Sequence, residues 1–222
     1  MRCRYCHNPD TWQMGPRPGQ QQATAAEILD RAERYREYWG AEGGITVSGG
    51  EALLQMDFLT ELFVEAKRRG ISTCLDTAAQ PFTREEPFFS RFERLMQFTD
   101  TVLLDIKHID DEAHRQLTGH GNRAILDCAR HLSDKAIPVW IRHVLVPSIT
   151  DNDGQLQRLN LFLRTLNNIE RIEVLPYHTL GTYKWKQLDI PYTLEGVQPP
   201  TQERVANAER ILREGVQFIG RP

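Results

Sequence analysis

The pattern that most constrains the fold of this chain is the alternation of short β-rich runs with amphipathic helical segments. Strands are expected at 45–47, 71–76, 101–106, 139–146 and 172–175, with a shorter one at 216–219. Strands that are separated by helices pair in parallel through right-handed crossovers. The runs 102–104 and 172–175 are too apolar for an exposed sheet edge. The sequence therefore predicts an α/β fold, an open barrel of parallel strands that helices cover.

Two of the helices have recognisable ends. Thr24-Ala25-Ala26-Glu27 forms a capping box, which begins a helix that extends toward Gly40. A second helix, 58–69, ends in Lys67-Arg68-Arg69-Gly70, where cations and a glycine suit a helix C-terminus. This basic run is therefore explained by helix capping. Because no internal repeat or domain boundary is visible, residues 1–222 are expected to form one domain.

Charge and hydropathy exclude several classes of function. The net charge of −3 gives no basic excess for binding nucleic acid. No apolar run approaches the roughly 18 residues that would span a bilayer, and the sequence from Met1 to Cys6 has no apolar signal-peptide core. We therefore expect a cytoplasmic protein that has neither nucleic acid nor a membrane as partner.

Polar residues follow five of the expected strands. In parallel α/β folds, ligands bind at the carboxyl ends of the strands, which meet at one edge. The residues at these ends carry backbone-exposing glycines, carboxylates, an ammonium, a guanidinium and imidazoles. They are Ser48-Gly49-Gly50-Glu51, Asp76-Thr77, Asp105 with Lys107, Arg142 or His143, and Tyr177-His178. The sequence therefore predicts a binding site at this edge of the sheet.

Two of the four cysteines, Cys3 and Cys6, form a C-x-x-C pair, whereas Cys74 and Cys128 lie in apolar stretches and are interpreted as core thiols. In a cytosolic chain such a pair is more often a metal or redox site than a disulfide. A structural zinc site needs four ligands, and no second pair follows. A thioredoxin-like pair begins a helix, whereas a loop follows here. From the pair alone, a zinc half-site, a thiol redox pair and chance all remain open.

The run M-R-C-R-Y-C-H-N-P-D-T-W resembles the cluster loop of radical S-adenosylmethionine (SAM) enzymes that activate glycyl-radical enzymes, in which C-x-x-x-C-x-aromatic-C holds a [4Fe-4S] cluster. The resemblance continues in order through SGGEALLQ, CLDT, LLDIKH, VWIRHVLVP and LPYHTLGTYKW. Cys3 and Cys6 match the second and third cysteines, and Tyr5 matches the aromatic residue. The first cysteine would lie two residues before Met1. The resemblance implies a partial parallel (β/α)6 barrel of radical SAM type, whose first strand is missing from this chain.

This resemblance also implies the chemistry. Three thiolates bind three irons and leave the fourth open for SAM. One electron then cleaves SAM to methionine and a 5′-deoxyadenosyl radical, which removes a Cα hydrogen from a glycine of a partner enzyme. No ferredoxin-like insertion follows Trp12, as in the compact, pyruvate formate-lyase-activating type. The implied partners are a glycyl-radical enzyme, expected to be pyruvate formate-lyase, and flavodoxin or ferredoxin as electron donor. The chain is expected to be a monomer.

Individual residues take roles by the same resemblance. Cys3 and Cys6 would hold the cluster and serve catalysis, while the SAM amino group would meet mainly the backbone at Gly49 and Gly50. His178 would contact the ribose or adenine of SAM, and Arg142 its carboxylate. The remaining implied cofactor-binding residues are Tyr5, His7, Glu51, Asp76, Thr77, Asp105, Ile106 and Lys107.

A monovalent cation is implied beside Asp76 and Thr77, although Ala78-Ala79 follows where the family has Asn-Gly. Each assignment has a simpler structural interpretation. Ser48-Gly49-Gly50-Glu51 could be a simple turn, and Asp105 and Lys107 could form an ion pair at the margin of the sheet that contributes little stability. His178 could be a structural histidine whose hydrogen bonds are satisfied within the protein.

Two other functions remain open at this level. A truncated remnant would dock its partner without chemistry, because the first strand and first cysteine of the family pattern are expected to be missing. A zinc or thiol-redox barrel would explain Cys3 and Cys6. It would leave the polar strand ends at 48–51, 105–107 and 176–178 without a function.

Overall fold

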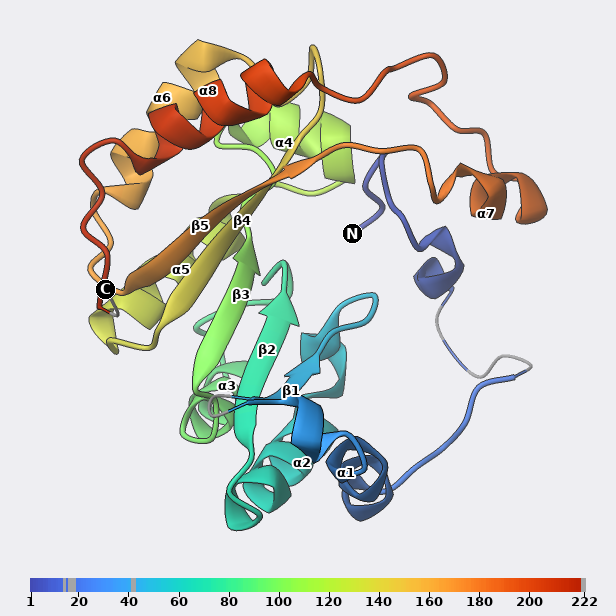
Figure 1. Ribbon diagram of the computed structural model, residues 1–222, viewed down its shortest axis with the longest axis vertical. Coiled ribbons are helices and arrows are strands. Elements are labelled where there is room, and N and C mark those ends of the chain that lie inside the picture. The colour runs from blue at the N-terminus through green and yellow to red at the C-terminus, as the bar shows by residue number, and fades with distance from the viewer. Residues whose placement is uncertain (14, 16–18, 41–42, 221–222) are drawn as a thin grey trace.

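The structure is a computed structural model that describes residues 1–222 apart from 14, 16–18, 41–42 and 221–222. Its centre is a parallel sheet of five strands in the order β1-β2-β3-β4-β5 (Figure 1). The strands are β1 (Gly44–Val47), β2 (Ser72–Thr77), β3 (Thr101–Asp105), β4 (Val139–Leu145) and β5 (Ile169–Pro176). Each strand pairs with the one before it in the chain, so every crossover advances the sheet in one direction. The predicted α/β class and parallel strands are confirmed, and the arrangement is that of a partial barrel.

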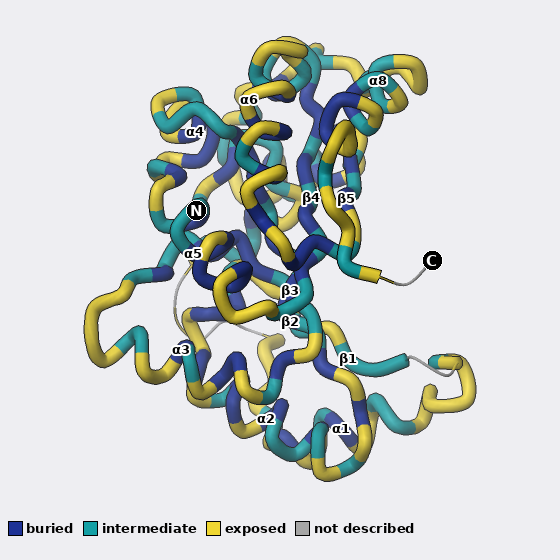
Figure 2. Tube along the Cα trace, turned by 90° about the vertical axis from the view of Figure 1, so that its left-hand side faces the viewer, coloured by how far each residue is buried: buried dark blue, intermediate teal, exposed yellow. Residues whose placement is uncertain are grey.

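Helices between the strands cover one face of the sheet, and Figure 2 shows that their outer turns are exposed while β3 and β4 are largely buried or intermediate. The helices are α1 (Ala25–Glu33), α2 (Met56–Arg68), α3 (Phe88–Met96), α4 (Asp111–Thr118), α5 (Arg123–Asp134), α6 (Asp153–Leu163), α7 (Thr182–Gln187) and α8 (Gln202–Arg213). Three single turns of 3-10 helix are η1 (Pro9–Trp12), η2 (Arg36–Tyr38) and η3 (Ala52–Gln55). One cluster of buried apolar side chains extends from α1 to α8. Among the described residues, no helix is long and apolar enough to cross a membrane.

Successive side chains of each strand point to opposite faces of the sheet. In β4, Val139 and Ile141 are buried in the apolar core under the helices, while Arg142 points to the other face and is half-buried. The register sets Arg142 directly beside Asp105 of β3. Polar strand ends therefore gather on the face that the helices leave uncovered.

The first helix is shorter than its sequence pattern predicts. The capping box forms as expected, since the Glu27 amide donates to the Thr24 hydroxyl (3.3 Å) and the Thr24 amide donates to the Glu27 carboxylate (2.8 Å). However, α1 ends at Glu33, and η2 follows. Tyr35 and Tyr38 are 62% and 84% exposed, so the helix loses its apolar contacts there, although Trp39 beyond η2 packs against the main core again.

The short strand expected at 216–219 is present only as a single bridge between Phe218 and Ile169.

Candidate functional site

A cavity of about 460 Å³ lies where the carboxyl ends of the strands meet the N-terminal segment. Its wall contains every site residue that the sequence predicts except Ile106: Cys3, Tyr5, Cys6, His7, Gly49, Gly50, Glu51, Asp76, Thr77, Asp105, Lys107, Arg142 and His178. Residues separated by as many as 175 positions are thus brought to one site. The predicted edge of the sheet is the edge that carries the cavity.

Ile106 and His143 point away from this cavity. Ile106 is 1% exposed, and its carbonyl oxygen lies 2.8 Å from Nδ1 of His143. The other ring nitrogen of His143, Nε2, lies 3.2 Å from the carbonyl oxygen of Thr150. Of the two residues that the sequence offers at the end of β4, Arg142 is therefore the one that reaches the site.

Four charged side chains alternate in sign across the floor of the cavity. Arg142 pairs with Asp76, and its Nε donates to Asp105 Oδ1 at 3.0 Å. Lys107 Nζ donates to the other oxygen of Asp105, also at 3.0 Å. The row Asp76, Arg142, Asp105, Lys107 contains two anions and two cations, so it has no net charge when all four are ionised. All four side chains are at most 20% exposed.

Burial and neighbouring charge oppose each other in this row. Burial alone would raise the pKa of Asp105, but Lys107 and Arg142 outweigh it and hold that pKa below its usual value. Burial would likewise lower the pKa of Lys107, yet the nearby Asp105 charge raises it well above its usual value. For Asp76 burial prevails over Arg142, and its pKa is raised. Asp105 and Lys107 are therefore both charged at neutral pH.

Glu51 is turned toward β2 rather than into open space. Its carboxylate accepts hydrogen bonds from the Thr77 hydroxyl (2.5 Å) and the backbone amides of Ala78 (3.1 Å) and Leu53 (3.2 Å). Burial raises its pKa, partly offset by these bonds. Glu51 and Thr77 therefore tie the exit of β1 to the exit of β2.

The two glycines of the same motif leave backbone accessible at the cavity. Gly49 has φ +156°, a conformation that residues with a side chain rarely adopt, and beyond its two chain neighbours no described atom lies within 4 Å of where its Cβ would be. A Cβ on Gly50 would lie 3.2 Å from the Thr11 hydroxyl. The geometry fits the expectation that this motif meets a ligand mainly through its backbone.

The N-terminal segment closes one side of the cavity. The Cys6 amide donates to the Cys3 carbonyl at 3.0 Å, which makes a tight turn between the two thiols. Cys3 is 7% exposed, and burial, the largest effect, raises its pKa. Cys6 is half-buried, and the exposed rings of His7 and His178 meet edge to face with centroids 5.2 Å apart. The turn thus presents both thiols beside the charged row.

The sequence interpretation missed several residues of the wall. Trp12, Leu54 and Val144 also line the cavity, and Leu54 is 56% exposed. Their apolar side chains resemble ordinary packing residues in the sequence. Trp12 lies close in sequence to Cys6, and Leu54 lies close to the 48–51 motif. This proximity is the one sequence signal that could have indicated their place at the site.

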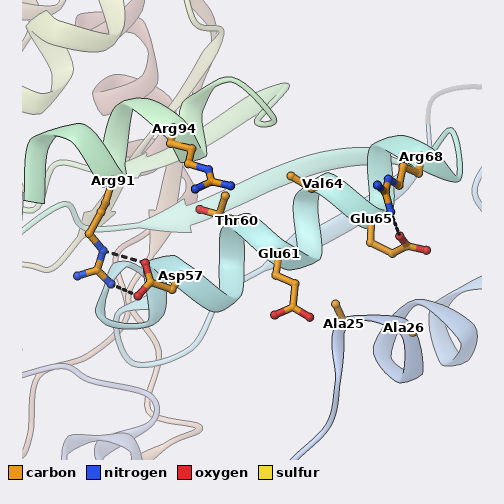
Figure 3. A pocket seen from close by; sticks show the side chains of 10 residues that line it. All are labelled: Ala25, Ala26, Asp57, Thr60, Glu61, Val64, Glu65, Arg68, Arg91 and Arg94. Atoms are coloured by element: carbon orange, nitrogen blue, oxygen red, sulfur yellow. Dashed lines mark hydrogen bonds and ion pairs between the residues drawn. The ribbon is translucent and has the colours of Figure 1, made fainter.

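A separate groove of about 570 Å³ lies over α1, α2 and α3 and contains none of the predicted residues. Figure 3 shows that charged side chains of α2 and α3 line it and that some of them pair with one another. Arg91 pairs with Asp57, and Arg68 lies 3.6 Å from Glu65. These exposed ion pairs are typical of a solvated helical surface. The cavity at the strand ends is therefore the better candidate site.

Comparison with known proteins identifies the family. The profile of the radical SAM superfamily matches residues 1–159. A pyruvate formate-lyase-activating enzyme from Streptococcus mutans is 54% identical over 212 residues, which are 96% of this chain and 80% of that protein. The chain belongs to the pyruvate formate-lyase-activating family of radical SAM enzymes. A relative of the same name from Listeria monocytogenes is 48% identical over 96% of this chain and 85% of its own length.

Solved structures support the radical SAM fold. A domain of pyruvate-formate lyase-activating enzyme from Bacteroides vulgatus aligns with a TM-score of 0.63, at 23% identity, over 80% of this chain and 99% of that one. A radical SAM methyltransferase from Sphaerobacter thermophilus aligns with a TM-score of 0.67, at 20% identity, over 99% of this chain and 62% of the other. At these identities the likeness concerns the fold alone.

Radical SAM enzymes use a [4Fe-4S] cluster and SAM, and the cavity offers two of the three thiols that the family pattern gives the cluster, together with polar groups for SAM. Cys3 and Cys6 offer two thiols at one wall, whereas Cys74 and Cys128 do not line it. The described residues contain no group of three or more His, Cys, Asp or Glu side chains placed to hold a metal ion. The buried Tyr5 hydroxyl has no hydrogen-bond partner of good geometry among the described residues. A polar ligand in the cavity would satisfy it.

Proposed function

We propose that this radical SAM enzyme activates pyruvate formate-lyase by removing a hydrogen atom from the Cα of one glycine in that partner. The observation that carries the proposal is the cavity in which Cys3 and Cys6 face the charged row at the strand ends. When bound there, the iron–sulfur cluster supplies the electron that cleaves SAM. The partner would insert its glycine into the same cavity. Family membership supports the choice of partner.

The chain's own residues would bind and orient the reactants. Cys3 and Cys6 would give thiolates to the cluster. Lys107 has three N–H donors and uses one on Asp105, so it can donate to the SAM carboxylate. Arg142 already serves two carboxylates and would act beside Lys107. A monovalent cation beside Asp76 and Thr77 stays a prediction, because Arg142 already supplies a positive charge to the Asp76 carboxylate.

His178 would contact the ribose or adenine without touching iron. We expect His178→Ala to keep the cluster but to weaken SAM binding by about 2- to 12-fold, the loss that one neutral hydrogen bond produces. Equilibrium binding of SAM to the reconstituted holoenzyme measures the change. His120→Ala is the matched control, because His120 is exposed and does not line the cavity. Loss of iron with unchanged SAM affinity would contradict the assignment.

The proposed reaction predicts a radical on a separate protein. With SAM and a reductant, the holoenzyme is expected to produce a glycyl doublet in the electron paramagnetic resonance spectrum of pyruvate formate-lyase. Replacing the acceptor glycine of the partner by alanine should remove the doublet while SAM cleavage remains detectable. SAM cleavage without a glycyl signal on this or any other glycyl-radical enzyme would favour a small-molecule substrate instead.

The remaining assignments are part of the same proposal. We propose flavodoxin or ferredoxin as electron donor, a monomeric state and a cytoplasmic location. Residues 1–222 would act as one domain, which the main apolar cluster extending from α1 to α8 supports.

A further inference from the structure

Helix α7 packs against the segment that carries the two cavity cysteines, although 179 positions separate Trp185 from Cys6 (Figure 1). Trp185 is 3% exposed, and its indole Nε1 donates a hydrogen bond to the Cys6 carbonyl at 2.9 Å. Its ring meets Trp12 edge to face at 4.9 Å and Tyr192 at 5.0 Å. The indole is therefore fixed on two sides and directs its one donor at the backbone of Cys6.

Two neighbours of Trp185 extend this contact along the segment. Lys184 Nζ donates to Asn8 Oδ1 at 2.5 Å and lies 3.5 Å from Asp10 Oδ1. Gly181 approaches so closely that a Cβ there would lie 2.7 Å from the carbonyl oxygen of His7, a distance that real Cβ atoms do not adopt. The contact thus includes a hydrogen bond, an ion pair and a close backbone approach.

The other half of the cysteine turn is held from a different element. The amides of Arg2 and Arg4 donate to Thr118 and Leu117 at the end of α4, at 3.0 and 2.9 Å. After Cys6, the Thr11 amide donates to the Asn8 carbonyl, a bond that stays within the N-terminal segment itself. Cys3 is therefore flanked by anchors on α4, whereas Cys6, whose amide binds Cys3 within the turn, is held to another element through its carbonyl by Trp185.

We propose that Trp185 is a positioning residue that fixes the backbone of Cys6, and with it the spacing of the Cys3 and Cys6 thiols. The proposal rests on the proposed function insofar as these thiols bind iron. Metal–ligand distances tolerate deviations of only about 0.2 Å, and groups that orient ligands typically change metal affinity 10- to 100-fold when removed. Ring packing alone fixes an approximate position, whereas the directional N–H bond fixes the Cys6 carbonyl.

The first test uses the metal-free protein, so it needs neither iron nor SAM. Trp185→Phe keeps an aromatic ring against Trp12 but removes the donor. The rate of alkylation by iodoacetamide is mapped at Cys6 and at Cys128, which is 0% exposed in α5 and reports global opening. We expect the Cys6 rate relative to the Cys128 rate to rise about 2- to 12-fold, as loss of one hydrogen bond permits. General destabilisation would raise both rates and leave their ratio unchanged.

Two further variants make this test specific. Trp140→Phe removes an equivalent indole bond, from Nε1 to Glu170 at 2.9 Å, and is expected to leave the ratio as in the parent. Gly181→Ala pushes on His7 without altering any donor and is expected to raise the ratio; it carries the test if Trp185→Phe does not fold. A parental ratio in Trp185→Phe, or an equal rise in Trp140→Phe, would overturn the proposal; if Trp185→Phe does not fold, a parental ratio in Gly181→Ala would overturn it.

The second test addresses the cluster. In the holoenzyme, Trp185→Phe should release iron to a chelator about 10-fold faster than the parent, and Trp140→Phe should not. A raised thiol ratio with a parental iron-release rate would overturn the part of the proposal that concerns the metal. Failure of the glycyl-radical experiment would leave the alkylation result unaffected, so the two hypotheses fail separately.

Discussion

Replacing Cys6 or Cys3 by alanine is expected to abolish both iron–sulfur loading and SAM cleavage in the holoenzyme. An iron that loses its thiolate is left to water, and the site that must stay open for SAM loses its geometry. Both thiols line the cavity, and the turn between them is fixed by the 3.0 Å bond from the Cys6 amide to the Cys3 carbonyl. Iron and sulfide content and 5′-deoxyadenosine release under dithionite measure the two losses.

Cys128→Ala is the control for these cysteine variants. Cys128 is fully buried in α5 and does not line the cavity, so its loss should leave iron content and SAM cleavage near parental values. Release of 5′-deoxyadenosine at a near-parental rate from Cys3→Ala or Cys6→Ala would contradict the cluster assignment. Zinc bound in place of iron would favour the alternative that the protein is a zinc-binding barrel.

The strand ends could be predicted from the sequence because they depend on local pattern and one general rule. The runs 71–76, 101–106 and 139–146 show β-rich composition, and parallel strands bring their carboxyl ends to one edge. This is sufficient to place Asp76, Asp105 and Arg142 near each other. It does not give their pairing, because the register that sets Asp105 beside Arg142 depends on how the intervening crossovers pack.

Other features of the site required the structure. Glu51 follows a strand and is acidic, which suggests a ligand contact, yet its carboxylate is satisfied by Thr77, Ala78 and Leu53. The contact of Trp185 with Cys6 joins residues 179 positions apart, and no periodicity in the sequence indicates it. The direction of a side chain, and contacts between residues far apart in the sequence, depend on how the elements pack. They could therefore not be predicted from the sequence pattern.

The charged row gives the second large effect. Asp105→Ala removes the anion that Lys107 and Arg142 share, so the row keeps two cations and only one anion. Removing one partner of a buried pair costs about 3–5 kcal/mol of folding stability, and we expect the lower end because Arg142 retains Asp76. The SAM sulfonium would also meet an excess of positive charge. We therefore expect SAM affinity to fall about 10- to 150-fold, as loss of a charge-assisted contact permits, while iron stays bound.

Two variants separate charge from shape and from general loss of a carboxylate. Asp105→Asn keeps the size of the side chain and one acceptor oxygen but loses the charge, so it should reproduce most of the fall in SAM affinity. Asp127→Ala removes a carboxylate that binds Arg84 through two bonds of 2.9 and 3.0 Å on an exposed surface, and it should change SAM affinity and melting temperature little. Chemical denaturation and equilibrium SAM binding measure the two quantities. If Asp105→Ala bound SAM as tightly as the parent, the role of Asp105 in SAM binding would be contradicted. Its ion pairs would then only stabilise the edge of the sheet.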